Sequence, residues 1–291
     1  MSARGFAVHA LSGEFVEKIG AIEALIKEFS RNPFRFIFLD PQGWADIPMR
    51  RLQPFLRNRS CEVLINLMTR HIIRFLDEPD RAESYNNLFG RNEVLEMLRN
   101  TSLRNSPSHE RAEQAVREYG RSLRLMCDFK YVSSAVILEP DQESIRYFLV
   151  YATNHPRGVE VFKGAEIKAA RIQDAVRHET HLRKTRQPGF VFDDGPPSSR
   201  LSLELRRFYS EIARKKVLEV LSATTSAAGV SYSDLFCEAM AFPLVSPDDL
   251  VSWLRALEPN IEIRFAGSQR RRKPFPLEDD RVVVINPKAL R

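Results

Sequence analysis

The sequence predicts an α/β domain followed by a smaller α+β domain, and three observations support this fold class. A short apolar run, Phe34 to Leu39, ends at Asp40-Pro41, which is the pattern of a buried parallel strand that stops at a loop. A helical pattern precedes that run, and a second apolar strand, Cys61 to Met68, follows it. Residues 201–291 then contain three helical patterns followed by two short strands.

Length and composition fit such a protein. The 291 residues are enough for two domains of roughly 100 to 200 residues each, and 43% apolar with 28% charged residues is typical of a globular chain. The net charge of +6 permits a polyanion partner, although an ordinary charged surface explains it equally well.

The cysteines and the lack of long apolar runs bear on location. Cys61, Cys127 and Cys237 lie far apart in apolar contexts, which predicts buried free thiols in a reducing compartment. The segment Met1 to Leu11 lacks the continuous apolar core of a signal peptide, and no run has the length of a membrane span. We therefore expect a cytoplasmic protein without a membrane partner.

The first domain is expected to begin with a strand–helix–strand unit, which favours a parallel sheet. A long polar and Pro/Gly-rich stretch after Lys184 marks the domain boundary. This gives an α/β domain over 1–184, a linker over 185–200 and a second domain over 201–291. The predicted elements of the first domain are strands at Phe6–Leu11, Phe34–Leu39, Cys61–Met68, Tyr131–Leu138 and Tyr147–Thr153, helices at Phe15–Phe29, Ile47–Leu56, Ile72–Leu76, Pro107–Met126 and Val159–Lys184, and a polar loop at Asp77–Asn87.

The pattern of helices and strands in the second domain predicts a winged helix. Capping boxes at Ser231 and Ser246 are expected to open its second and third helices. Two strands, Ile261–Phe265 and Arg281–Ile285, follow as a ribbon. Three helices followed by a two-stranded ribbon is the order of this helix-turn-helix variant.

Four strings resemble the three-Cys-motif partner protein (TcmP) family: FIFLDPQGWADIPM, CEVLINLMTRHIIRF, the Leu88-Phe89-Gly90 step and YFLVYATNHPRGVEVFKGAE. The resemblance covers nearly the whole chain. It implies a partial class I methyltransferase-like (Rossmann-like) sheet, S-adenosylmethionine as cofactor and a three-Cys-motif protein as partner. The Gly-rich turn that opens the family's fold is missing, because no Gly-x-Gly-x-Gly occurs and Met1 falls just before the expected third strand. Either the chain is a truncation or another polypeptide completes the site.

The loop from Asp40 to Trp44 is the first candidate site, because ligands of open α/β sheets bind outside the carboxyl ends of the strands. The loop is similar to the Asp-Pro-Pro-Tyr motif of amino-group methyltransferases. That similarity implies that Asp40 and the Pro41 carbonyl accept hydrogens from a substrate amine while Trp44 stacks on a flat base. A strand end with a proline turn and a packed Trp44 explains the same residues.

Other candidates are assigned by their place after a strand. Ser12 and Glu14 would follow the third strand and contact the cofactor, or simply begin a helix. Asn66, Arg70 and His71 follow the Cys61–Met68 strand at the same edge as Asp40 and are expected to line a substrate pocket. Asn154-His155-Pro156 would lie at the opposite edge and form a turn. No hydrolase elbow or metal-ligand spacing occurs, so no metal is expected.

Arg270, Arg271, Arg272 and Lys273 would form the wing tip, where consecutive cations suit phosphate contacts with nucleic acid. A basic wing used for protein contact explains them equally well. Three functions therefore remain open: an S-adenosylmethionine-dependent methyltransferase-like protein with an unknown acceptor, a non-catalytic interaction subunit of a three-Cys-motif protein, and a nucleic-acid-binding protein.

Overall fold

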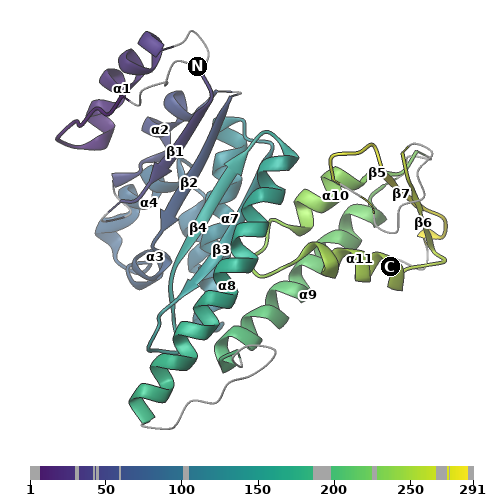
Figure 1. The fold of residues 1–291 in the computed structure, drawn as a ribbon. Coiled ribbons are helices and arrows are strands. Elements are labelled where there is room, and N and C mark those ends of the chain that lie inside the picture. Colours follow the sequence, from purple (N-terminus) through teal and green to yellow (C-terminus); the bar gives the residue numbers. More distant parts are fainter. Residues whose placement is uncertain are drawn as a thin grey trace, which may run out of the picture.

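A computed structural model describes residues 7–29, 33–41, 43, 46–58, 60–100, 105–185, 198–224, 228–266, 274 and 276–287. Its first part is a four-stranded sheet with helices on both faces (Figure 1). The elements of this part are α1 (Phe15–Phe29), β1 (Arg35–Leu39), α2 (Met49–Leu56), β2 (Cys61–Leu67), α3 (Thr69–Arg74), η2 (Pro79–Arg81), α4 (Ala82–Phe89), α5 (Val94–Arg99), α7 (Ser108–Cys127), β3 (Tyr131–Leu138), β4 (Ile145–Thr153) and α8 (Pro156–Thr185).

The strands of this sheet run in the order β1-β2-β4-β3. The parallel pairing predicted for β1 and β2 is confirmed, with Arg35 opposite Cys61 and Leu39 opposite Ile65. The predicted hairpin is confirmed as well, because β4 runs antiparallel to β3. β4 is also antiparallel to β2. The carboxyl ends of β1 and β2 therefore lie at one end of the sheet, and the carboxyl end of β4 lies at the opposite end.

The prediction that Phe34 to Leu39 is buried is wrong. Among the described residues β1 pairs with β2 alone, so it lies at the edge of the sheet. Phe34, Phe36 and Phe38 are 64%, 56% and 55% exposed, while Leu39 is buried. The reason is the alternation of a strand: one face turns toward α1 and α2, and the other lies on the side of α8, which contacts mainly β3 and β4 (Figure 1).

The expected strand at Phe6–Leu11 is also wrong. Phe6 lies outside the described residues, and residues 7–12 have no regular structure. Val8 is 91% exposed. A short apolar run becomes a strand only where a neighbouring strand satisfies its backbone groups, and no described strand lies beside it. The strand–helix–strand unit therefore lacks its first strand in the described chain.

The segment Asp77–Asn87 was expected to be a loop but contains η2 and most of α4. Tyr85, Leu88 and Phe89 of α4 are buried, and the Tyr85 hydroxyl donates a hydrogen bond to the Ile72 carbonyl. The helix ends at Gly90 with φ +67°, a left-handed conformation that glycine adopts freely. Three apolar residues at helical spacing define this helix, and the polar residues around them hide the pattern.

The second part has the predicted element order and one additional short strand. It comprises α9 (Arg200–Ser222), β5 (Val230–Ser231), α10 (Tyr232–Ala239), α11 (Pro247–Ala256), β6 (Ile261–Arg264) and β7 (Arg281–Val284), with the strands in the antiparallel order β5-β7-β6. The capping box at Ser246 is confirmed, with Asp249 as its reciprocal partner. The one at Ser231 is wrong, because that side chain makes no capping bond. The wing tip at 270–273 lies outside the described residues.

The two parts share one continuous buried core. Ser133 and Ser134 of β3 donate hydrogen bonds to the carbonyls of Met240 and Ala241, in the segment between α10 and α11. The buried Lys163 of α8 donates to the Phe242 carbonyl at 2.8 Å. Most of the expected linker, residues 186–197, lies outside the described chain.

The predicted state of the cysteines is confirmed: Cys61, Cys127 and Cys237 are buried and free. Burial raises the pKa of the Cys61 thiol to about 11 and those of Cys127 and Cys237 to about 12, so all three stay protonated at neutral pH. Within the described ranges, no helix combines the length and apolar character needed to cross a membrane.

Candidate functional site

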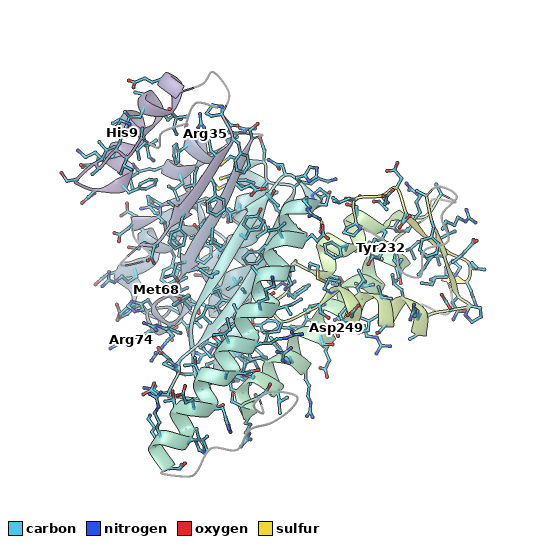
Figure 2. All side chains as sticks on the ribbon, viewed as in Figure 1. His9, Arg35, Met68, Arg74, Tyr232 and Asp249 are labelled. Atoms are coloured by element: carbon cyan, nitrogen blue, oxygen red, sulfur yellow. The ribbon has the colours of Figure 1, made fainter. Side chains whose placement is uncertain are left out.

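A groove lies at the end of the sheet where the carboxyl ends of β1 and β2 meet. Figure 2 labels Met68 and Arg74 at this end of the sheet and Arg35, the first residue of β1, at the other end. The groove has a volume of about 1000 Å³, enough for a small-molecule ligand. Its lining includes Asp40, Asn66, Met68, Thr69, Arg70, His71, Arg74, Ser108, Glu139, Ser144, Arg146 and Tyr147.

Asp40 and Asn66 meet in this groove, as their positions after neighbouring parallel strands predicted. The Asn66 amide donates a hydrogen bond to Asp40 Oδ1 at 2.7 Å. This assignment of the amide follows from chemistry, because a carboxylate accepts and only the NH₂ group can donate. The second oxygen of Asp40 and the Asn66 Oδ1 then remain as acceptors.

Three buried polar atoms of the groove lining have no hydrogen-bond partner among the described residues: Asn66 Oδ1, Thr69 Oγ1 and Ser144 Oγ. The Asn66 and Thr69 side chains are 7% and 1% exposed. A buried polar group without a partner destabilises a fold by about 1–3 kcal/mol. In a groove lining, a ligand or an ordered water can supply the missing partner.

The mouth of the groove carries cations from two elements. Arg70 of α3 and Arg146 of β4 lie 3.6 and 4.0 Å from the two carboxylate oxygens of Glu139. The Arg74 guanidinium lies over the Phe75 ring, 5.3 Å from its centroid, and His71 is edge-on to the same ring. The predicted pocket residues Arg70 and His71 therefore line the same groove as Asp40.

The other predicted site residues lie elsewhere. Pro41 directly follows Asp40 and is half-buried, while Trp44 is outside the described residues. Ser12 and Glu14 are exposed residues before α1, and neither lines the groove. They follow no strand, because the strand expected at Phe6–Leu11 is absent from the described chain.

Asn154 and His155 form the turn between β4 and α8, as predicted. The Lys130 backbone N–H donates to Asn154 Oδ1 at 2.8 Å, and the Arg157 N–H donates to His155 Nδ1 at 3.1 Å. Because β4 is antiparallel, this turn is at the end of the sheet opposite to Asp40. Beside it, Thr153 donates to the Glu62 carboxylate at 2.9 Å.

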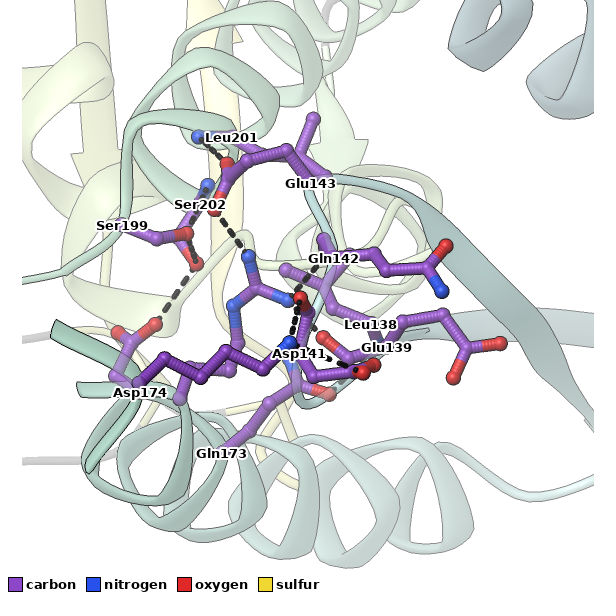
Figure 3. A network of polar contacts seen from close by, with 12 residues as sticks. Leu138, Glu139, Asp141, Gln142, Glu143, Gln173, Asp174, Ser199, Leu201 and Ser202 are labelled. Atoms are coloured by element: carbon purple, nitrogen blue, oxygen red, sulfur yellow. Dashed lines mark hydrogen bonds and ion pairs between the residues drawn. The ribbon is translucent and has the colours of Figure 1, made fainter. Parts of the chain in front are cut away.

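Glu139 and the polar network beside it (Figure 3) were not indicated by the sequence analysis. Arg177 of α8 is 6% exposed and donates to the main-chain carbonyls of Glu139 and Gln142. It also pairs with Glu143, whose carboxylate accepts the Leu201 N–H of α9 at 2.8 Å. The turn after β3 is therefore held by hydrogen bonds to both α8 and α9. Arg177 has no local pattern that distinguishes it from the exposed charges of α8.

The described residues do not by themselves fit S-adenosylmethionine. The cofactor needs a close backbone approach at a glycine turn and a carboxylate for its ribose. The described glycines with positive φ are Gly13, Gly90 and Gly229, and none lines the groove. Neither does Glu14. Among the described residues, no group of three or more His, Cys, Asp and Glu side chains could hold a metal ion.

Comparison of the chain with protein-family models, curated proteins and solved structures found no match.

Proposed function

We propose that this chain is the acceptor-binding part of an S-adenosylmethionine-dependent methyltransferase that acts with a three-Cys-motif partner. The observation that carries the proposal is the hydrogen-bonded pair of Asp40 and Asn66 at the carboxyl ends of two parallel strands. The strand order β1-β2-β4-β3 is the order expected for the second half of a class I methyltransferase sheet. The helix, strand and hairpin order of the second part supports a winged helix.

In this proposal Asp40 positions an amine. Its second carboxylate oxygen and Asn66 Oδ1, which has no partner among the described residues, would accept the amine hydrogens and so fix the orientation of the nitrogen. Asn66 holds the Asp40 carboxylate in place through the bond of 2.7 Å. S-adenosylmethionine bound by the complete assembly would supply the methyl group, and the Asp40 carboxylate would take up the proton that the amine releases.

The cofactor is proposed to bind only in the assembly. The described residues lack a glycine turn at the groove, and β1 has an open edge where further polypeptide can continue the sheet. Residues from a three-Cys-motif partner or from another segment would complete the site there.

Calorimetric titration tests this proposal. S-adenosylmethionine is titrated into the purified chain alone and into its complex with a three-Cys-motif protein. We expect no heat with the chain alone and micromolar binding with the complex, and loss of methyl transfer in the Asp40→Asn variant. If the complex binds no S-adenosylmethionine, the proposal is wrong.

A second candidate is a non-catalytic interaction subunit. The open edge of β1, with three phenylalanine side chains more than half exposed, favours it, because large exposed apolar patches mark interaction sites. Co-purification with a three-Cys-motif protein, without cofactor binding by the complex, would support this function over the first.

Nucleic-acid binding through Arg270 to Lys273 remains a prediction, since these residues lie outside the described chain. Salt-dependent retention on DNA that disappears when the four residues are changed to Ala would support it. Unchanged retention in that variant would exclude this surface.

A further inference from the structure

Glu139 holds two guanidinium groups at the mouth of the groove. Its carboxylate oxygens lie 3.6 Å from Arg70 and 4.0 Å from Arg146, which are ion-pair distances but too long for hydrogen bonds. Both arginine side chains are well exposed, at 60% and 57%. Their donors therefore remain available to a ligand that approaches more closely than Glu139 does.

A phosphate is such a ligand. A phosphate monoester carries about two negative charges and three acceptor oxygens, and its geometry suits the planar donor forks of two arginines. Exposed ion pairs such as those of Glu139 contribute little, so a phosphate would displace the carboxylate. The Glu139 main chain would stay in place, because Arg177 holds its carbonyl (Figure 3).

The inner part of the groove suits a different chemical group, one that donates hydrogen bonds. Asn66 Oδ1 and the buried Thr69 hydroxyl have no hydrogen-bond partner among the described residues, and Asp40 uses only Oδ1 to accept from the Asn66 amide. A carboxylate and a carbonyl oxygen side by side fit an NH₂ group, which donates one hydrogen to each. A hydroxyl such as that of Thr69 can donate to a ring nitrogen beside this amine.

We propose that the groove binds a nucleotide whose base has an exocyclic amine. The base amine lies between Asp40 and Asn66, and the phosphate lies between Arg70 and Arg146, where it replaces Glu139. This inference rests on the proposed function for the site and names its acceptor class. Two sources share the chemistry: a free nucleotide such as AMP or CMP, and the same nucleotide within a single strand.

Binding measurements on the full chain, without a methyl donor, test the inference. The probes are AMP, adenosine, which lacks the phosphate, and inosine monophosphate, which has the purine and phosphate but no exocyclic amine. We expect adenosine and inosine monophosphate each to bind at least about tenfold more weakly than AMP. Short oligonucleotides of adenine or of hypoxanthine form the second arm and separate a strand from a free nucleotide. Equal binding of amine-bearing and amine-free probes, or no binding in either arm, would overturn the inference.

Variants separate the two subsites. Arg70→Ala with Arg146→Ala should weaken AMP to the level of adenosine, whereas Asn66→Ala should remove the preference for AMP over inosine monophosphate. Glu139→Gln should tighten AMP severalfold, because the competing charge is gone. Arg157→Ala is the matched control, since this cation lies at the start of α8, outside the groove. Tightening or weakening by the control equal to that of the groove variants would show only a general charge effect.

These experiments distinguish failure of the proposed nucleotide site from failure of the proposed methyltransferase function. Binding with the expected preferences, but without methyl transfer by the complex, would sustain the nucleotide site and reject the methyltransferase. Methyl transfer to an acceptor without phosphate would reject the nucleotide site and sustain the methyltransferase.

Discussion

Only glycine fits at position 158, in the first turn of α8. A Cβ there would lie 2.9 Å from Glu62 Oε1 and Thr153 Oγ1 and would also strike the Tyr151 hydroxyl. These three oxygens end side chains of the sheet, so either these side chains or the helix would have to shift. Gly158→Ala is expected to destabilise the protein by about 1–3 kcal/mol, measured by urea denaturation. Gly164→Ala, in the same helix with nothing within 4 Å of its Cβ, should instead stabilise by up to about 1 kcal/mol.

Glu113 of α7 makes stability depend on pH in an unusual direction. Burial raises its pKa from 4.5 to about 8, although Arg117 and Tyr209 oppose this. Between these values the folded state keeps a proton that the unfolded state has lost, so stability falls as pH rises from about 4.5 to 8. The slope is at most about 1.4 kcal/mol per pH unit.

Denaturation at several pH values checks this dependence. Glu113→Gln should remove that part of the slope and be more stable than the original chain at pH 8. Glu96→Gln, at a well-exposed carboxylate, should leave the slope unchanged. A slope that persists in the Glu113 variant would contradict the assignment.

At the level of residues, the sequence predicted the half of the groove that follows from strand order. Asp40 and Asn66 each come at the end of an apolar strand, and the ends of parallel strands meet. Glu139 and Arg146 lie at the hairpin of β3 and β4, and their distance from α3 depends on the pairing of β4 with β2. This distance cannot be predicted from the local sequence, so these two residues were not predicted.

At the level of elements, α11 begins with a capping box that α10 lacks. Ser246 Oγ accepts the Asp249 N–H at 3.2 Å, and the Ser246 N–H donates to Asp249 Oδ2 at 2.8 Å. Ser246→Ala is expected to destabilise the protein by about 1 kcal/mol, measured by thermal or urea denaturation. Ser231→Ala is the control, because this serine has no capping bond and should change stability little. Equal losses in both variants would contradict a capping role.

The strand β1 is expected to promote self-association, because its apolar side chains and its open edge are both exposed. Phe36→Lys with Phe38→Lys should shift the protein toward the monomer in sedimentation velocity runs over a range of concentrations. Ile172→Lys with Val176→Lys removes exposed apolar side chains from α8 without changing a strand edge. An equal shift with this control would show that general hydrophobicity, and not the edge, drives association.

Elements were predicted best where a pattern is long or has a clear end. The hairpin of β3 and β4 is confirmed because its apolar runs are long and end at turn residues, and α8 is confirmed because no proline interrupts it after Pro156. The apolar run before α1 fails since a strand needs a neighbour, which the run itself cannot reveal. The helix α4 was missed because only one side of its two turns is buried.

At the level of the whole molecule, a buried ion pair joins the two parts. Lys163 pairs with Glu166 and donates to the Phe242 carbonyl, while Glu166 accepts the Leu244 N–H at 2.8 Å. Lys163→Met leaves a buried carboxylate without its cation and should destabilise the protein by about 3–5 kcal/mol. The double variant Lys163→Met with Glu166→Gln keeps an acceptor for Leu244 and has no lone charge.

The double variant should therefore be more stable than Lys163→Met alone, as measured by urea denaturation. Both parts of the original chain should unfold in one transition, because they share a core. Two separate transitions in the original chain would show that the contacts at Lys163 do not couple the parts. This coupling was beyond sequence analysis, which predicted a boundary but not the docking of the α10–α11 segment on β3.

The two edge strands of the four-stranded sheet differ in whether another described segment of the chain pairs with them. This difference limits how many copies of the chain can associate through the sheet. At β3 the Ser134 N–H donates to the Ala241 carbonyl at 3.1 Å, so the chain covers that edge itself, whereas no described residue pairs with the outer edge of β1. A sheet with a single free edge is monovalent for strand addition. Two copies that pair through β1 about a twofold axis would use up both edges and stop, so edge pairing of this sheet gives a closed dimer and not a filament.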